Sequence, residues 1–91
     1  VDIVSAAVLV DYLGIGSAIV PELVEGRGTV RCQHGVIPVP APATLAICSE
    51  HGLPLTISGI DVELVTPTGA ALVAALHPTS ARPAGMRVLA F

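Results

Sequence analysis

The sequence predicts a small α+β domain with two hairpins, three helices and a last strand. Three stretches carry apolar residues at helical spacing, shorter runs of strand length lie between them, and glycine or proline follows most runs. Helical and extended stretches alternate irregularly, which favours α+β over a doubly wound parallel sheet. A length of 91 residues fits one domain.

The first part of the chain predicts a helix and then a hairpin. Residues 2–13, DIVSAAVLVDYL, are apolar on nearly every helical face, which is typical of a helix buried on several sides, and Gly14 ends it. Residues 18–25 predict an edge strand, because Pro21 has no N–H to donate to a neighbouring strand. The Gly-Arg-Gly turn then leads to a returning strand at residues 29–32.

The later elements follow from proline and threonine positions. Each proline of VIPVP pushes the residue before it into the extended region, and Pro42 suits the first turn of a helix. The sequence TPTG before AALVAAL predicts a third helix with a threonine cap. The predicted elements are an extended segment at 36–40, a helix at 42–50, a second hairpin from strands 53–57 and 61–65, a helix at 70–76 and a last strand at 86–91.

The composition predicts that this chain is a fragment that packs against other protein. It is 53% hydrophobic and only 12% charged, where soluble domains carry about 25% charged residues. A chain this short leaves much of its surface exposed, so we expect the remainder of a parent protein, or other copies in a homo-oligomer, to cover apolar surface. The missing initial Met and the strand-like ending MRVLAF support the same expectation.

Charge and hydropathy exclude two partner classes. The net charge is −3 and the four arginines are scattered, whereas nucleic-acid binding needs a cationic stripe. The most apolar stretch, residues 1–20, is interrupted by two aspartates and two glycines, so no membrane span or secretory signal is expected. Two cysteines without targeting features predict a reducing, cytoplasmic location.

The segment RCQHG contains a candidate metal site. Cys32 and His34 are two residues apart, so on a strand they share a face, and a thiolate with an imidazole can bind one metal ion. Cys48 and His51, three apart on a helix, could supply two further ligands. The spacing argues against a zinc finger, and in the simpler interpretation Cys48 is a core residue and His51 an exposed helix end.

The segment TPTG is a candidate anion site. Thr66 or Thr68 can cap the following helix, and Gly69 lets a ligand approach the backbone. Free amides at a helix N-terminus attract phosphate, although the absence of lysine excludes a P-loop. The alternative is a capped helix with no ligand.

Three stretches together resemble one family. They are DIVSAAVLVDYLGI at 2–15, GTVRCQHGVIPVPAPATLAIC at 28–48 and ELVTPTGAALVAAL at 63–76. They resemble the central part of the nickel-insertion proteins of nickel-pincer cofactor biosynthesis, the pyridinium-3,5-bisthiocarboxylic acid mononucleotide nickel chelatases. The chain departs from the family pattern at Ser5, where glycine is usual, and at Arg31, where lysine is usual.

The resemblance implies that residues 1–91 are a single-domain central segment of a CTP-dependent nickel chelatase, or cyclometallase. Such a protein inserts nickel, its substrate metal, into a pyridinium bisthiocarboxylate mononucleotide. CTP and its divalent ion are expected elsewhere in the full-length protein, and the isolated segment is expected to be inactive. On this hypothesis Cys32 and His34 face the metal or substrate, Thr66 to Gly69 hold an anionic group, and both open onto one cleft.

Two other functions stay open at this point. The segment could be a structural or oligomerisation module of the same protein, with no catalytic residues of its own. It could instead be an unrelated small Cys/His metal-binding domain.

Overall fold

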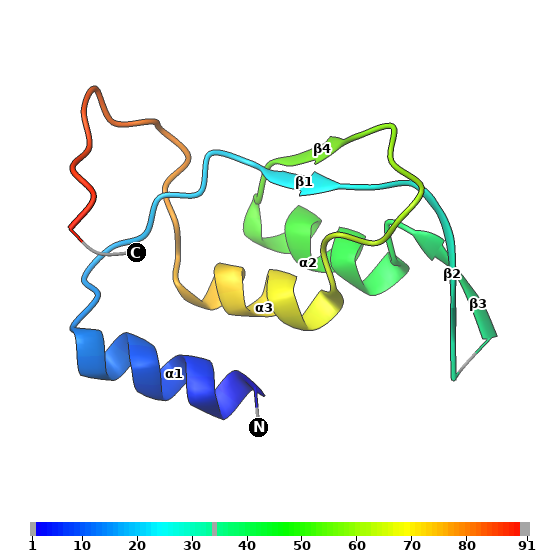
Figure 1. The fold of residues 1–91 in the computed structure, drawn as a ribbon, viewed down its shortest axis with the longest axis horizontal. Coiled ribbons are helices and arrows are strands. Elements are labelled where there is room, and N and C mark those ends of the chain that lie inside the picture. The colour runs from blue at the N-terminus through cyan, green and yellow to red at the C-terminus, as the bar shows by residue number, and fades with distance from the viewer. Residues whose placement is uncertain (1, 34, 90–91) are drawn as a thin grey trace.

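The computed structural model describes residues 2–33 and 35–89. It has three helices and four short strands, which confirms the α+β class (Figure 1). The elements in chain order are α1 Asp2–Leu13, β1 Leu23–Glu25, β2 Gly28–Cys32, β3 Gly35–Val39, α2 Pro42–His51, β4 Leu55–Ile57 and α3 Pro67–Ala75.

The strands pair differently from the prediction of two hairpins. β2 and β3 form one antiparallel hairpin, in which Gly28 faces Val39 and Cys32 faces Gly35. β1 does not return onto β2 but pairs in parallel with β4, from Leu23 opposite Leu55 onward. The prediction of a hairpin around the Gly-Arg-Gly turn was therefore wrong, because the strands on either side of this turn have different partners.

Two predicted strands are absent from the described part of the chain. Residues 61–65 form a loop, because the amides of Leu64 and Val65 donate to the side chain of Glu25 and not to a neighbouring strand. Residues 86–89 adopt no strand either, while Ala90 and Phe91 lie outside the described residues. Within the predicted strand 18–25, only β1 is a strand, preceded by a parallel bridge between Ile19 and Thr79.

Helices α1 and α2 begin and end within one residue of the prediction, whereas α3 begins at Pro67, before the predicted range 70–76. Pro42 occupies the first turn of α2, and Gly52, at φ 64°, ends it by donating its N–H to the Cys48 carbonyl. Thr66 caps α3 with its side chain.

A small core lies where α2 and α3 pack beneath the β1–β4 pair (Figure 1). Cys48, Leu53 and Ala74 form its buried centre, and four partly buried residues pack around them, namely Leu23, Ile47, Leu55 and Val73. Helix α1 lies against α3, and its apolar residues Val4, Val8 and Leu9 are exposed. The sequence predicted that α1 is buried on several sides. Within this segment it is not, because these side chains are exposed.

Candidate functional site

Cys32 lies at the end of the hairpin that projects from the helices. It is the last residue of β2, opposite Gly35, and its side chain is exposed. His34, the other predicted metal ligand, lies outside the described residues. Figure 1 shows the tip of the β2–β3 hairpin well apart from the N-terminus of α3.

The wider four-ligand set is not assembled among the residues described. Cys48 is buried in α2 within the core, while His51 is exposed at the end of the same helix. Residues 2–33 and 35–89 contain no group of three or more histidine, cysteine or acidic residues that could hold a metal ion.

Thr66 caps the first turn of α3 with both its side chain and its backbone carbonyl. Its Oγ1 accepts a hydrogen bond of 3.0 Å from the Gly69 amide, and its carbonyl accepts one of 2.9 Å from Ala70. A Cβ on residue 69 would lie 3.1 Å from this Oγ1, so glycine gives the cap its space. The Thr66 hydroxyl proton remains available to a ligand. Thr68 is exposed, and its amide is not used by the cap.

The two predicted groups do not share either of two cavities that lie among the described residues. Neither the groove between α1 and α3 nor the cavity between α2 and α3 is lined by Cys32, Thr66, Thr68 or Gly69.

Glu25 holds the chain that leads into α3, and the sequence did not single it out. Its side chain is fully buried, and Oε1 accepts hydrogen bonds from the amides of Gly26 at 2.8 Å, Leu64 at 2.6 Å and Val65 at 3.1 Å. Oε2 is also buried and has no partner among the described residues. Because Val65 directly precedes Thr66, Glu25 fixes the start of α3.

The residues after Glu25 reinforce this contact. Gly26 packs so closely under the loop that a Cβ there would overlap the Val62 carbonyl oxygen and lie 2.6 Å from that of Ile60. The Arg27 amide donates to the Ile60 carbonyl at 2.8 Å. Glu25–Gly28, called here the EGRG segment, thus joins the end of β1 to the loop before α3.

The proline-rich motif meets the threonine-rich one through Thr44. This residue is fully buried on α2, and its Oγ1 donates to the Val65 carbonyl at 3.3 Å. Val39 and Ala41, which flank Pro40, are buried as well. The prolines therefore direct the backbone into α2, and α2 in turn supports the residue before Thr66.

Comparison with known proteins assigns the family. A family model described as Nickel insertion protein matches residues 1–91, the whole chain. The chain belongs to the nickel insertion protein family. The resemblance noted from its three motifs is thereby confirmed.

Two relatives within this nickel insertion family carry a more specific name, pyridinium-3,5-bisthiocarboxylic acid mononucleotide nickel insertion protein. The one from Alkaliphilus metalliredigens is 51% identical over 84 residues, covering 92% of this chain and 20% of the relative. The one from Clostridium acetobutylicum is 45% identical over 75 residues, covering 82% of this chain and 17% of the relative. The chain thus spans about a fifth of its relatives' length, and no solved structure matches it.

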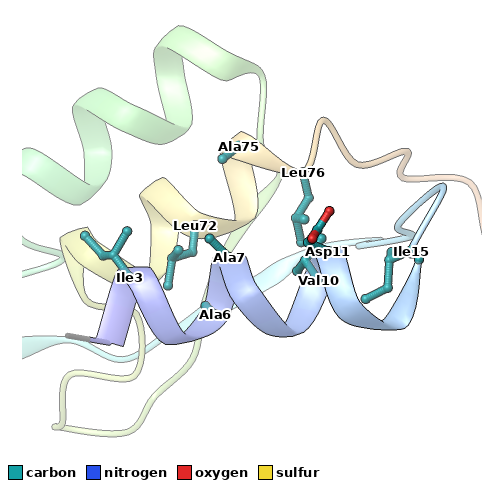
Figure 2. Close-up of a pocket in the computed structure, with 10 residues that line it drawn as sticks. Ile3, Ala6, Ala7, Val10, Asp11, Ile15, Leu72, Ala75 and Leu76 are labelled. Carbon is teal, nitrogen blue, oxygen red and sulfur yellow. The ribbon is translucent and has the colours of Figure 1, made fainter.

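Two of the three stretches that carry the family resemblance, residues 2–15 and 63–76, contribute to an apolar groove. α1 and α3 enclose about 490 Å³, and Asp11 is the only charged residue among those described along it. In Figure 2, Ile3 and Ile15 lie at opposite ends of the groove, with Leu72 of α3 between them. None of the helices formed by the described residues has the length and apolar character needed to span a bilayer.

The two thiols of this family member lie in opposite environments. Cys32 is exposed, whereas Cys48 is buried beside Ala74 and Leu53. Burial, and after it the negative charge of Glu25, raise the pKa of the Cys48 thiol above its ordinary value of about 8.5.

Alkylation should distinguish the two thiols. In the folded chain, iodoacetamide is expected to modify Cys32 readily and Cys48 slowly, because burial limits access and the raised pKa of Cys48 lowers its thiolate fraction. Mass spectrometry of peptide digests over time measures this difference. In urea both sites should react at similar rates, and equal rates in the folded chain would contradict the placement of Cys48.

Proposed function

We propose that this chain is the single-domain central segment of a protein that inserts nickel into pyridinium-3,5-bisthiocarboxylic acid mononucleotide, its substrate. The family match over the whole chain and the names of the two relatives support this proposal. The full protein would consume CTP with a divalent ion bound outside this segment, and the segment alone would be inactive.

In this proposal Cys32 and His34 bind nickel or a sulfur-bearing part of the substrate. Thiolate sulfur and imidazole nitrogen are both suitable donors for nickel. The exposure of Cys32 at the hairpin end supports such a role, because an incoming metal or substrate can reach it without any rearrangement of the core.

Thr66, Thr68 and Gly69 would bind the phosphate of the mononucleotide. The N-terminus of α3 carries partial positive charge, and the cap leaves the Thr66 proton and the Thr68 hydroxyl available as donors. Glu25 and Thr44 would keep this turn in place before the ligand binds. The remainder of the protein would complete the cleft toward the hairpin.

The insertion rate of the full-length protein tests these roles. Cys32→Ala and His34→Ala are each expected to lower it at least about tenfold through loss of a ligand. Thr68→Val should raise KM for the mononucleotide about 10- to 100-fold, as expected for a lost hydrogen bond to a charged group. Ser49→Ala, an exposed change on α2, is the matched control. Unchanged kinetics in Cys32→Ala and Thr68→Val would refute both assignments.

A structural or oligomerisation role is the second candidate, favoured by the exposed apolar side of α1. The remainder of the parent protein, or other copies of it, would cover this surface. Normal kinetics in all the variants above, with altered assembly in a Leu9→Glu variant, would support this role over direct catalysis. A cytoplasmic location is part of the proposal, because Cys32 and Cys48 are free thiols.

A further inference from the structure

A small cavity between the ends of α2 and α3 carries two histidines. It encloses about 230 Å³, and its lining residues are Ile47, His51, Ala71, Ala74, Ala75 and His77. The four others are aliphatic, so two imidazoles are the polar side chains of an otherwise apolar lining. Neither histidine belongs to the motifs that carry the family resemblance.

Both histidines lie at helix C-termini. His51 is the last residue of α2, and His77 directly follows Leu76, the residue that caps α3. The two helices pack against each other and run in the same direction, so their C-termini lie at the same end of the pair (Figure 1). Each C-terminus carries partial negative charge, and two together favour a cation between them.

The backbone at His77 is held in an uncommon conformation. Its φ is 47°, in the left-handed region that residues other than glycine rarely adopt. Its amide donates to the Ala74 carbonyl at 3.0 Å, which fixes the turn. Such outliers persist where the surrounding structure requires them, often at ligand sites. His77 in this turn and His51 at the end of α2 both line the cavity.

We propose that His51 and His77 together bind a divalent transition-metal ion. Neutral imidazole is the commonest metal ligand in proteins and suits nickel, copper and zinc. Two protein ligands leave the other coordination positions to water, so the ion would exchange readily, as a site that passes a metal onward requires. The choice of nickel as the ion rests on the proposed function, whereas the pairing of the two imidazoles does not.

This site is separate from the one proposed at Cys32 and His34. The C-termini of α2 and α3 lie at the left of the helix pair in Figure 1, and the hairpin projects at the right. The two sites therefore predict different responses to substitution.

Titration calorimetry of the 91-residue chain with nickel chloride tests the site. The unmodified chain should show saturable binding, and His51→Ala or His77→Asn should weaken it at least about tenfold through loss of one ligand. Asparagine suits residue 77 because it tolerates left-handed backbone. Ser49→Ala, an exposed change on α2 outside both proposed metal sites, is the matched control and should leave this binding unchanged.

Three results would overturn the proposal. One is the absence of saturable nickel binding in the unmodified chain. The other is wild-type affinity in His51→Ala, an exposed helix-end change that circular dichroism can verify as folded. If His34→Ala and Cys32→Ala remove all binding instead, the hairpin is the metal site and the His51–His77 assignment is wrong. None of these results decides the proposed function, which is tested separately by the insertion rates of its own variants.

Discussion

The Glu25→Ala variant is expected to lose about 3–5 kcal/mol of unfolding free energy. Three backbone amides that donate hydrogen bonds to Oε1 would then remain inside the protein without a partner, and each such amide costs about 1–3 kcal/mol. The Leu64 amide is only partly buried and should contribute the least. A chain of this length has a total stability of roughly 5–13 kcal/mol. The expected loss is therefore a large share of the total stability of the chain.

Urea denaturation followed by circular dichroism measures this loss, since the chain has no tryptophan for fluorescence. Glu25→Gln keeps an acceptor oxygen but loses the charge that strengthens its hydrogen bonds, so it should cost only about 1–2 kcal/mol. Glu50→Ala, on the exposed face of α2, is the control and should change stability by less than about 0.5 kcal/mol. Equal stability of Glu25→Ala and Glu50→Ala would show that the buried carboxylate is not needed.

Gly26→Ala, which adds a methyl group at this position, is the second substitution with a large expected effect. Gly26→Ala should destabilise the chain by about 3 kcal/mol, the upper end for overpacking, because the new Cβ meets backbone oxygens of Val62 and Ile60 and not a movable side chain. The loop must then shift and loses the bond from the Arg27 amide to the Ile60 carbonyl. The exposed ion pair of Arg27 with Asp61 contributes little by comparison.

Gly59→Ala provides the matched control for this prediction. It lies in the same loop, and a Cβ there would meet nothing within 4 Å. If both variants unfold with the same m-value, the difference between their urea midpoints measures the difference in their stability. If Gly26→Ala were as stable as Gly59→Ala, the close packing of the EGRG segment under the loop would be refuted.

Local features of the fold could be predicted from the sequence, and strand pairing could not. Pro42 and Gly52 mark the ends of α2 because they act on the backbone next to them. The partner of β1 depends on contacts far along the chain, and no turn residue encodes its parallel pairing with β4. The predicted strand at 61–65 failed because a carboxylate, and not a strand, binds the amides of Leu64 and Val65.

The candidate site was predictable to a similar degree. The Thr66 cap follows from the TPTG sequence and was confirmed. Glu25 gave no signal, because a single carboxylate at a strand end usually lies in solvent, and its burial depends on amides some 40 residues later. The sequence analysis also predicted that Cys32 and Thr66 open onto one cleft. The spacing of the motifs along the chain does not determine whether two residues lie close together in the fold.

The long separation between Glu25 and its amide partners has a consequence for synthesis on the ribosome. The Val65 amide follows Glu25 by 40 residues, which corresponds to roughly 2–8 s of translation. During that interval the carboxylate remains solvated, whereas the β2–β3 hairpin, whose strands are adjacent in the nascent chain, can already form. The turn that opens α3 thus acquires its final geometry late, after most of the segment has been translated.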